Sequence, residues 1–261
     1  MIDIHCHLIP YVDDGAEDWD SALEMARREV ADGIVEAIVT PHWAGPQEGV
    51  DEQLARLAEL EERLREEEIP LKLHPGNELI LVPELPELIA AGKALTLAGT
   101  SYLLLETAQL AGGPFVKQAV FSLRSAGFQV ILAHPARAPF WQERPDDLEE
   151  LVHAGCHLQI NAGSLTGGFG RRAQTTAEYL LRRGWVAFLA SDAHNLDSRP
   201  PGLREAVQRA AHLIGEERAR DLVEKNPARL LRNRPVYVEP LTRQDLPRRS
   251  WWNRLLHRGP G

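Results

Sequence analysis

The chain has 261 residues, of which 44% are hydrophobic and 26% charged, and these values are typical of a soluble globular protein with one large core. Its formal net charge of −9 argues against a nucleic-acid-binding protein, because such proteins present a basic face to phosphate groups. The sequence has two cysteines, no apolar stretch of membrane-spanning length and no signal-peptide pattern before its first strand. These features predict a cytoplasmic protein without a disulfide framework.

One unit recurs along the chain: a helical stretch ends in glycine, a short apolar strand follows, and the strand ends in polar residues. The glycines are Gly33, Gly127, Gly155 and Gly184, and they stand where helices favour a positive φ. The strands are almost continuously apolar, which is typical of a parallel sheet covered on its outer face. In chain order the predicted strands are Met1–His7, 34–40, Leu71–His74, Ser101–Glu106, 128–133, 156–160 and 185–190, with predicted helices at Trp19–Ala31 and Asp51–Glu67.

About seven β/α units predict an α/β protein that closes into a barrel, one unit short of the usual eight. An open doubly wound sheet is the structural alternative, but no GxGxxG sequence or P-loop opens any of the helices. We expect residues 1–234 to form this catalytic barrel domain, and residues 235–261 to form a separate basic, tryptophan-containing tail.

Histidines and carboxylates gather at the ends of these strands. His5 and His7 project to one face of the first strand because side chains alternate along a strand, and Asp13 and Asp14 follow in the next loop. In β/α barrels the carboxyl ends of the strands meet at the end that carries the chemistry. The other strand-end residues are His42, Glu78, Glu106, His134, Asp192 and His194.

So many buried carboxylates are costly without cations, and bound metal ions remove that cost. A single four-coordinate zinc ion needs only three or four protein ligands. The set therefore predicts two or three divalent ions, and ligation by nitrogen and oxygen admits manganese, iron or zinc.

Eight stretches in order resemble the PHP (polymerase and histidinol phosphatase) superfamily. They are IDIHCHLIPYVDDGA, IVTPH, GNEL, YLLLE, VILAHPAR, QINAGSLTGGFG, ASDAHN and EKNPARLL, and they span Ile2 to about Leu231. More closely, the chain resembles the bacterial CpsB/YwqE-type manganese-dependent protein-tyrosine phosphatases of capsule and exopolysaccharide synthesis. The chain departs from the usual family pattern at Tyr11, Trp43 and Ala136.

This resemblance implies a distorted (β/α)7 TIM-like barrel (the PHP fold) with a trinuclear site, in which manganese is the expected metal. It implies that Arg137 and Arg199 contact the phosphate. A phenolate is a leaving group that can depart without a dedicated general acid, and His42 is the candidate for that second role. The alternative is that both arginines are ordinary surface or ion-pair residues. The implied metal ligands are His5, His7, Asp14, His42, Glu78, Glu106, His134, Asp192 and His194.

The implied function is hydrolysis of phosphotyrosine on proteins by a metal-activated hydroxide, with the tyrosine-rich tail of a bacterial tyrosine kinase as the expected substrate. A thiolate mechanism is excluded because neither Cys6 nor Cys156 lies in a C-x5-R motif. A phosphatase of a small phosphomonoester such as histidinol phosphate is the first alternative. A non-catalytic PHP-fold module for binding or regulation is the second.

The tail after Leu241 contains five arginines and one acid. Its segment 248–256 combines basic and aromatic residues at helical spacing, a pattern typical of a helix that lies on a membrane surface or binds a partner. The alternative is a loosely ordered tail that packs its tryptophans on the barrel.

Overall fold

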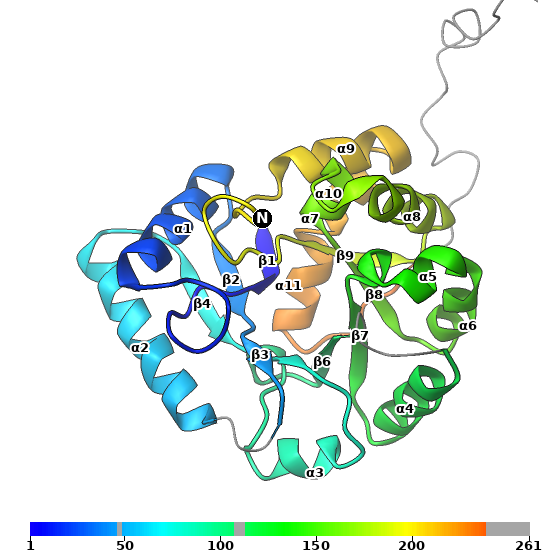
Figure 1. The fold of residues 1–261 in the computed structure, drawn as a ribbon, viewed down its shortest axis with the longest axis horizontal. Helices are drawn as coiled ribbons and strands as arrows, with labels where there is room; N and C mark the ends of the chain where they lie inside the picture. Colours follow the sequence, from blue (N-terminus) through cyan, green and yellow to red (C-terminus); the bar gives the residue numbers. More distant parts are fainter. Residues whose placement is uncertain (46–48, 107–112, 239–261) are drawn as a thin grey trace, which may run out of the picture.

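Short apolar runs form parallel strands in the computed structural model, which describes residues 1–45, 49–106 and 113–238. The strands surround the centre of the molecule and the helices lie outside them (Figure 1). The first sheet pairs β1 (Ile2–Cys6), β2 (Glu36–Val39) and β4 (Lys72–Pro75), in that order. The second sheet pairs β3 (His42–Trp43), β5 (Glu78–Leu79), β6 (Tyr102–Glu106), β7 (Gln129–Ala133), β8 (His157–Asn161) and β9 (Val186–Ala190), in that order.

The two sheets together make one barrel of seven strand positions, because β3 continues the path of β2 and β5 continues that of β4. The break between β2 and β3 contains Pro41, which has no N–H to donate to a neighbouring strand. The barrel closes between its first and last strands. There the backbone N–H of Asp192 donates to His5 O over 2.8 Å, and that of His7 donates to Ala193 O over 2.9 Å. The predicted α/β barrel of seven parallel strands is thus confirmed.

Helices follow most of the strands, and the four glycines predicted to end helices or turns all have positive φ. Gly33 and Gly184 adopt the left-handed conformation directly after the first and eighth helices. The helices are α1 (Trp19–Asp32), α2 (Val50–Glu66), α3 (Leu85–Ala90), α4 (Gly113–Ser125), α5 (Pro139–Glu143), α6 (Leu148–His153), α7 (Ala162–Thr166), α8 (Gly170–Arg183), α9 (Arg204–Ile214), α10 (Glu216–Asp221) and α11 (Lys225–Leu231).

Both faces of the strands are buried, which explains why the strands read as continuous apolar runs. On β6, Leu104 faces the barrel interior with Ile131 and Phe188. Leu103 and Leu105 on the same strand face outward into the larger cluster between strands and helices. Two apolar layers therefore fix the strands, and polar side chains are left for the strand ends.

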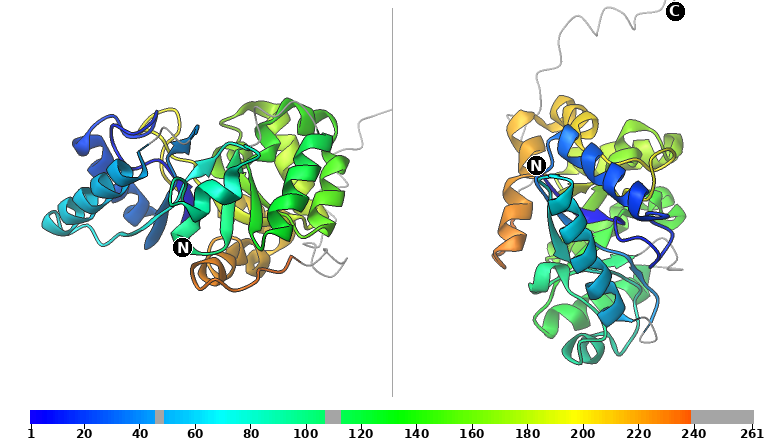
Figure 2. Two further views of the ribbon diagram at one scale, coloured as in Figure 1. Left: turned by 90° about the horizontal axis from the view of Figure 1, so that it is seen from below. Right: turned by 90° about the vertical axis from the view of Figure 1, so that its left-hand side faces the viewer.

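Helix α11 closes one end of the barrel, and Figure 2 shows it (orange) beyond the strands. Its Leu230 is buried in the inner cluster, and Asn226 Nδ2 donates to Ala187 O over 2.8 Å. Val236 is also buried there, and its N–H donates to the Tyr102 hydroxyl over 3.0 Å. The opposite end, where the strands terminate in polar residues, stays accessible.

The predicted domain boundary between residues 234 and 235 stays a prediction. Val236, on the tail side of that boundary, is packed in the inner apolar cluster of the barrel. Residues 239–261, on which the predicted membrane or partner helix falls, lie outside the described residues. Among the residues that the structure describes, no helix is both long enough and apolar enough to cross a membrane.

Candidate metal centre

The nine predicted ligands lie at or just beyond the carboxyl ends of the strands, and the structure brings all nine together in three overlapping groups. Strand β1 places His5, and the residue directly after the strand, His7, in the centre. Cys6 between them packs in the outer apolar cluster, with its Sγ 3.5 Å from Ile38 O. This alternation follows from the pleat of the strand, and it confirms that Cys6 points away from the centre.

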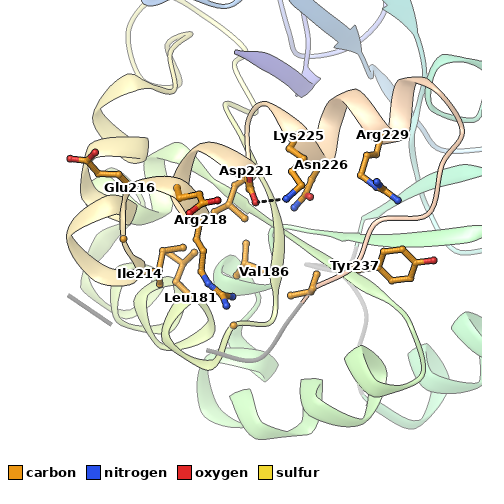
Figure 3. Close-up of a pocket in the computed structure, with 15 residues that line it drawn as sticks. Leu181, Val186, Ile214, Glu216, Arg218, Asp221, Lys225, Asn226, Arg229 and Tyr237 are labelled. Carbon is orange, nitrogen blue, oxygen red and sulfur yellow. Dashed lines mark hydrogen bonds and ion pairs between the residues drawn. The ribbon is translucent and has the colours of Figure 1, made fainter. Parts of the chain in front are cut away.

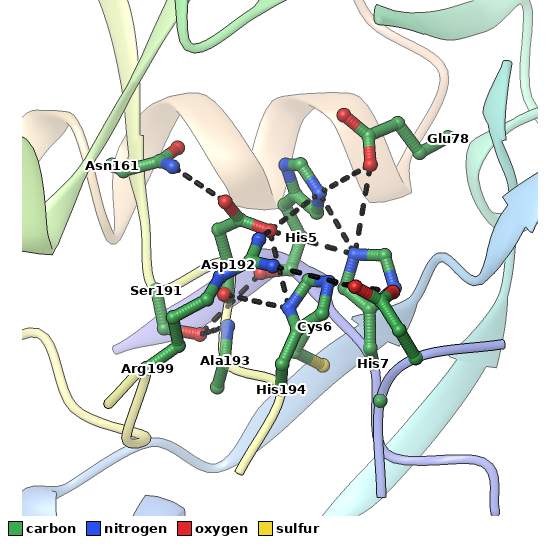
Figure 4. A network of polar contacts seen from close by, with 12 residues as sticks. His5, Cys6, His7, Glu78, Asn161, Ser191, Asp192, Ala193, His194 and Arg199 are labelled. Atoms are coloured by element: carbon green, nitrogen blue, oxygen red, sulfur yellow. Dashed lines mark hydrogen bonds and ion pairs between the residues drawn. The ribbon is translucent and has the colours of Figure 1, made fainter. Parts of the chain in front are cut away.

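The first group surrounds the two imidazoles of β1 (Figure 4). Nε2 of His5 and Nε2 of His7 are 3.2 Å apart. Glu78 Oε2 lies 3.3 Å from His5 Nε2 and 3.6 Å from His7 Nε2. Asp192 Oδ1 lies 3.3 and 3.5 Å from the same two nitrogens. All four side chains are buried, so two carboxylates and two imidazoles converge on one space without access to bulk water.

The second group adds the loop after β1 and the ends of two other strands. It consists of His7, Asp14, His42 and His194. Asp14 Oδ1 lies 3.2 Å from His42 Nε2 and 3.3 Å from His194 Nε2. The side chain of Asp14 is 65% exposed and that of His42 is 38% exposed. This group therefore forms the solvent side of the centre.

The third group consists of Glu78, Glu106 and His134. His134 Nε2 lies 2.7 Å from Glu78 Oε1 and 3.7 Å from Glu106 Oε2. Glu78 thus presents one oxygen to this group and the other to the first group. His7 likewise belongs to both the first and the second group. Three groups linked by shared residues are the arrangement expected of a cluster of ions with bridging ligands rather than of isolated sites.

Several buried polar atoms in the centre have no hydrogen-bond partner among the described residues. They are Glu78 Oε2, His134 Nδ1 and His194 Nε2. His194 donates its Nδ1–H to Asp192 O over 3.0 Å, which leaves the Nε2 lone pair aimed into the second group. Because an unsatisfied buried polar atom is costly, Glu78 Oε2 and His194 Nε2, which face the first and second groups, fit the donors of a metal ion.

The charges of the centre point to the same chemistry. Burial would raise the pKa of Glu78, but the neighbouring His5 and His134 hold it well below its usual range. Burial would also raise the pKa of Asp192, and His5 and His7 hold it well below its usual range. Both carboxylates are therefore ionised. Burial and the neighbouring His7 lower the pKa of His194 to about 2, so its imidazole is neutral, the form that ligates metals.

Both predicted arginines point into the centre rather than to solvent. Arg137 Nη1 lies 2.8 Å from Asp192 Oδ2, and Arg199 Nη2 lies 2.8 Å from Asp192 Oδ1. The guanidinium of Arg137 also stacks over the ring of Phe169, 4.3 Å from its centroid. One buried carboxylate thus holds both guanidinium groups at the edge of the candidate ligands, where their remaining N–H groups can face an anion.

Known proteins resemble this chain over most of its length. The family described as capsular polysaccharide synthesis, CpsB/CapC, matches residues 1–232. The chain belongs to the CpsB/CapC family. It is 36% identical over 242 residues to the tyrosine-protein phosphatase YwqE of Bacillus subtilis, covering 92% of this chain and 95% of that protein. It is 27% identical to the tyrosine-protein phosphatase CpsB of Streptococcus agalactiae, covering 89% of this chain and 99% of that protein.

Solved structures agree with this membership of the CpsB/CapC family. One matches with a TM-score of 0.86 and 34% identity, covering 93% of this chain and all of that one. It belongs to work on YwqE from Bacillus subtilis and CpsB from Streptococcus pneumoniae, which are unique metal-dependent tyrosine phosphatases. Histidinol phosphate phosphatase from Lactococcus lactis matches with a TM-score of 0.55 and 14% identity, covering 84% of this chain and 93% of that one. At that identity the likeness shows a shared fold.

A second layer of polar residues orients the candidate ligands of this CpsB/CapC chain. Asp13 Oδ2 accepts a hydrogen bond from His7 Nδ1 over 2.6 Å, which directs the Nε2 lone pair of His7 to the centre. Gln159 Oε1 accepts from the His134 backbone N–H and lies 3.2 Å from His5 Nδ1. Asn161 Nδ2 donates to Asp192 Oδ2 over 2.6 Å. Such outer partners fix ligand orientation.

Sequence reasoning assigned no role to Gln159, although a polar residue inside the apolar run 156–160 was a usable signal. Asp13 was noted beside Asp14 without a role of its own. The departures at Trp43 and Ala136 remove no candidate ligand, since all nine are present in the three groups. Both residues are buried, and Trp43 Nε1 donates to Lys93 O over 2.8 Å.

A pocket of 580 Å³ lies away from this centre (Figure 3). Its lining includes Val186 at the start of β9, whereas Asp192 follows the end of that strand. An ion pair of 3.2 Å between Lys225 and Asp221 lies in its wall. None of the nine candidate ligands lines this pocket, so its size does not identify the site of the chemistry.

Proposed function

We propose that this chain is a metal-dependent protein-tyrosine phosphatase. The observation that carries the proposal is the set of three linked ligand groups, with two arginines held on the shared Asp192 at its edge. Membership of the CpsB/CapC family and likeness to relatives named tyrosine-protein phosphatases support it. The presence of every candidate ligand argues against a module kept only for binding.

The nine candidate ligands would hold two or three divalent ions, with His7 and Glu78 shared between groups. We propose manganese, and iron or zinc also suit donors of nitrogen and oxygen. Such ions supply Lewis acidity toward phosphoryl oxygens and lower the pKa of water at the site.

The protein's own residues bind and orient the ester. Arg137 and Arg199 are placed to donate to the phosphoryl oxygens, where charge is concentrated in the transition state. Their side chains are 28% and 19% exposed, so they can be reached from solvent while Asp192 keeps them in position. A guanidinium suits this role because its planar fork matches the oxygens of a phosphate.

His42 is the imidazole among the candidate ligands that solvent reaches most readily. Burial lowers the pKa of His42, but the contact with Glu78 and the negative charges of Glu78 and Asp13 together outweigh this and raise the pKa above its ordinary value. We propose that His42 has a second role in protonating the leaving oxygen. A phenolate needs little such help, which favours aryl esters.

We further propose that the substrate is a phosphotyrosine protein of the cytoplasm, in particular the tyrosine-rich tail of a bacterial tyrosine kinase that controls capsule or exopolysaccharide synthesis. The names of the relatives support the phosphotyrosine protein, and the description of the family supports the capsule context.

The test is phosphate release from a phosphotyrosyl peptide and from histidinol phosphate, after metal removal and return of Mn²⁺. His134→Ala removes a buried candidate ligand. The control is His212→Ala, because His212 is exposed and bonds to the carbonyl of Gln208 in its own helix.

We expect metal-restored hydrolysis of the peptide by the wild type and by His212→Ala, and none by His134→Ala. Hydrolysis of histidinol phosphate alone would move the proposal to small phosphomonoesters. No hydrolysis of either ester, with metal bound, would refute an esterase function.

A further inference from the structure

A small pocket of 130 Å³ opens directly beside the candidate metal centre. We call it the Tyr11 pocket. His42 belongs to both the metal centre and the pocket, because it is a candidate ligand and also forms part of the pocket wall. The pocket and the centre therefore share one wall residue, His42. The pocket is lined by Tyr11, Val12, Pro41, His42, Trp43, Gly49, Val50, Glu52 and Gln53.

Tyr11 is unusual in both its backbone and its side chain. Its φ is +66°, a left-handed conformation that is uncommon for a residue other than glycine and costs energy for a bulky side chain. The residue is nevertheless 55% exposed, so burial does not offset that cost. Backbone strain of this kind collects at functional sites. Asp192 and His134 in the centre also have positive φ, at +54° and +35°.

The exposed ring is held in place rather than free to swing. Trp19 meets it edge-on, with ring centroids 6.2 Å apart and an angle of 79°. The Arg56 guanidinium lies over the ring, 5.4 Å from its centroid. Glu52 Oε1 in turn accepts hydrogen bonds from Arg56 Nε and Nη2 over 3.1 and 2.7 Å. An exposed aromatic ring with two direct partners, one of them fixed by an ion pair, is a preformed wall.

The same contacts decide what kind of group the pocket suits. Glu52 is the acidic residue of the lining, and its charge is paired with Arg56. The pocket therefore offers no free carboxylate to an aminoalkyl group. Tyr11, Pro41 and Val50 contribute apolar or aromatic surface beside the polar side chains of His42, Glu52 and Gln53. That surface can contact a planar ring.

We propose that the Tyr11 pocket receives the aryl ring of the phosphomonoester, and that Tyr11 is a specificity-determining residue that selects aryl esters by stacking. This inference rests on the proposed phosphatase function and extends it to the substrate's side chain. In this arrangement the ring enters between Tyr11 and Pro41 while the phosphoryl group lies at the candidate ligands.

The experiment compares two ligands of the Mn²⁺-loaded full chain: a phosphotyrosyl peptide, by its KM, and inorganic phosphate, by its inhibition constant. Inorganic phosphate reaches the centre but has no ring. The variants are Tyr11→Gly, Tyr11→Phe and Glu68→Gly. Glu68 is an exposed residue with a φ of +54° at the far end of α2, so its replacement relieves similar backbone strain without touching the pocket.

Tyr11→Gly is expected to raise KM for the peptide about three- to tenfold, the loss of one aromatic contact. The inhibition constant of phosphate stays unchanged, and resistance to urea is equal or greater because glycine tolerates this φ. Tyr11→Phe and Glu68→Gly keep the wild-type KM. An unchanged KM in a folded Tyr11→Gly, or equal rises in both constants, would overturn the role of Tyr11. Failure of the wild type to hydrolyse any ester would instead refute the proposed function.

Discussion

Replacing Asp13 by asparagine tests whether the second layer of residues sets the metal affinity. Asp13 Oδ2 accepts from His7 Nδ1 over 2.6 Å and from the His42 backbone N–H over 2.9 Å. Its Oδ1 accepts from the Gly15 backbone N–H over 2.9 Å. Three donors therefore converge on one carboxylate, which cannot donate and so keeps the proton of His7 on Nδ1.

An asparagine at this position changes two quantities by separate routes. Its NH2 group replaces one accepting oxygen, so one buried backbone N–H loses its partner, at a cost of about 1–3 kcal/mol in the free energy of unfolding. The same NH2 can donate to His7 Nδ1, which moves the proton to Nε2 and removes the lone pair aimed at the centre. Loss of such an outer partner lowers metal affinity about 10- to 100-fold, equivalent to about 1.4–2.8 kcal/mol.

The assay is a Mn²⁺ titration of the metal-stripped protein against a competing fluorescent chelator, with urea unfolding measured in parallel. Asp18→Asn is the matched control: Asp18 caps α1 by accepting from the Ser21 N–H, and asparagine caps a helix equally well. A wild-type affinity in Asp13→Asn, alongside lost binding in His7→Ala, would refute the orienting role of Asp13.

Three further predictions concern the stability of the fold. Removing metal should lower the thermal unfolding midpoint, and Mn²⁺ should restore it, because Glu78 and Asp192 are buried and ionised. Equal midpoints with and without metal in thermal scans would contradict the presence of a metal centre. Burial lowers the pKa of His157 to about 4 from its ordinary 6.5. The unfolded chain therefore binds this proton first, and the stripped protein should lose about 3 kcal/mol as pH falls from 6.5 to 4. In urea titrations His157→Phe should lose about 3 kcal/mol less than the wild type over this pH range, because His194, whose pKa is also lowered, contributes equally in both proteins; a pH dependence equal to the wild type's would contradict the role of His157. In Gly76→Ala the new Cβ would lie 2.9 Å from Ile38 Cγ2, so urea unfolding should show a loss of about 1–3 kcal/mol, whereas wild-type stability would disprove this clash.

Much of the fold could be predicted because its signals are local. Each glycine, apolar run and strand-end histidine stands within a few residues of the feature that it predicts. His5 and His7 could be assigned to one face because alternation along a strand needs no tertiary information. The division of two strands at residues 40–41 and 76–77 was missed, although Pro41 and Gly76 marked the positions.

The parts that could not be predicted depend on partners distant in the chain. The residues alone did not separate Asp13 from Asp14, and only the resemblance favoured Asp14 as a ligand. In the structure the loop folds back so that Gly15 lies against His7 O, where a Cβ would be 2.4 Å away. That path turns Asp13 to His7 and Asp14 to His42 and His194. The two ion pairs of Asp192, with Arg137 and with Arg199, could likewise not be predicted, because these residues meet only in the closed barrel.

The closure of the barrel between β1 and β9 also orders events during synthesis. His5 and His7 leave the ribosome first, whereas Asp192 and His194 follow only after most of the chain has been made. At bacterial translation rates this interval is roughly 10 to 40 seconds. Throughout it, the first strand has no partner at one edge and the two leading imidazoles have no carboxylate from the last strand. The metal centre is therefore completed late in biosynthesis, and a chain truncated before β9 would lack both the ligands and the strand that close the ring.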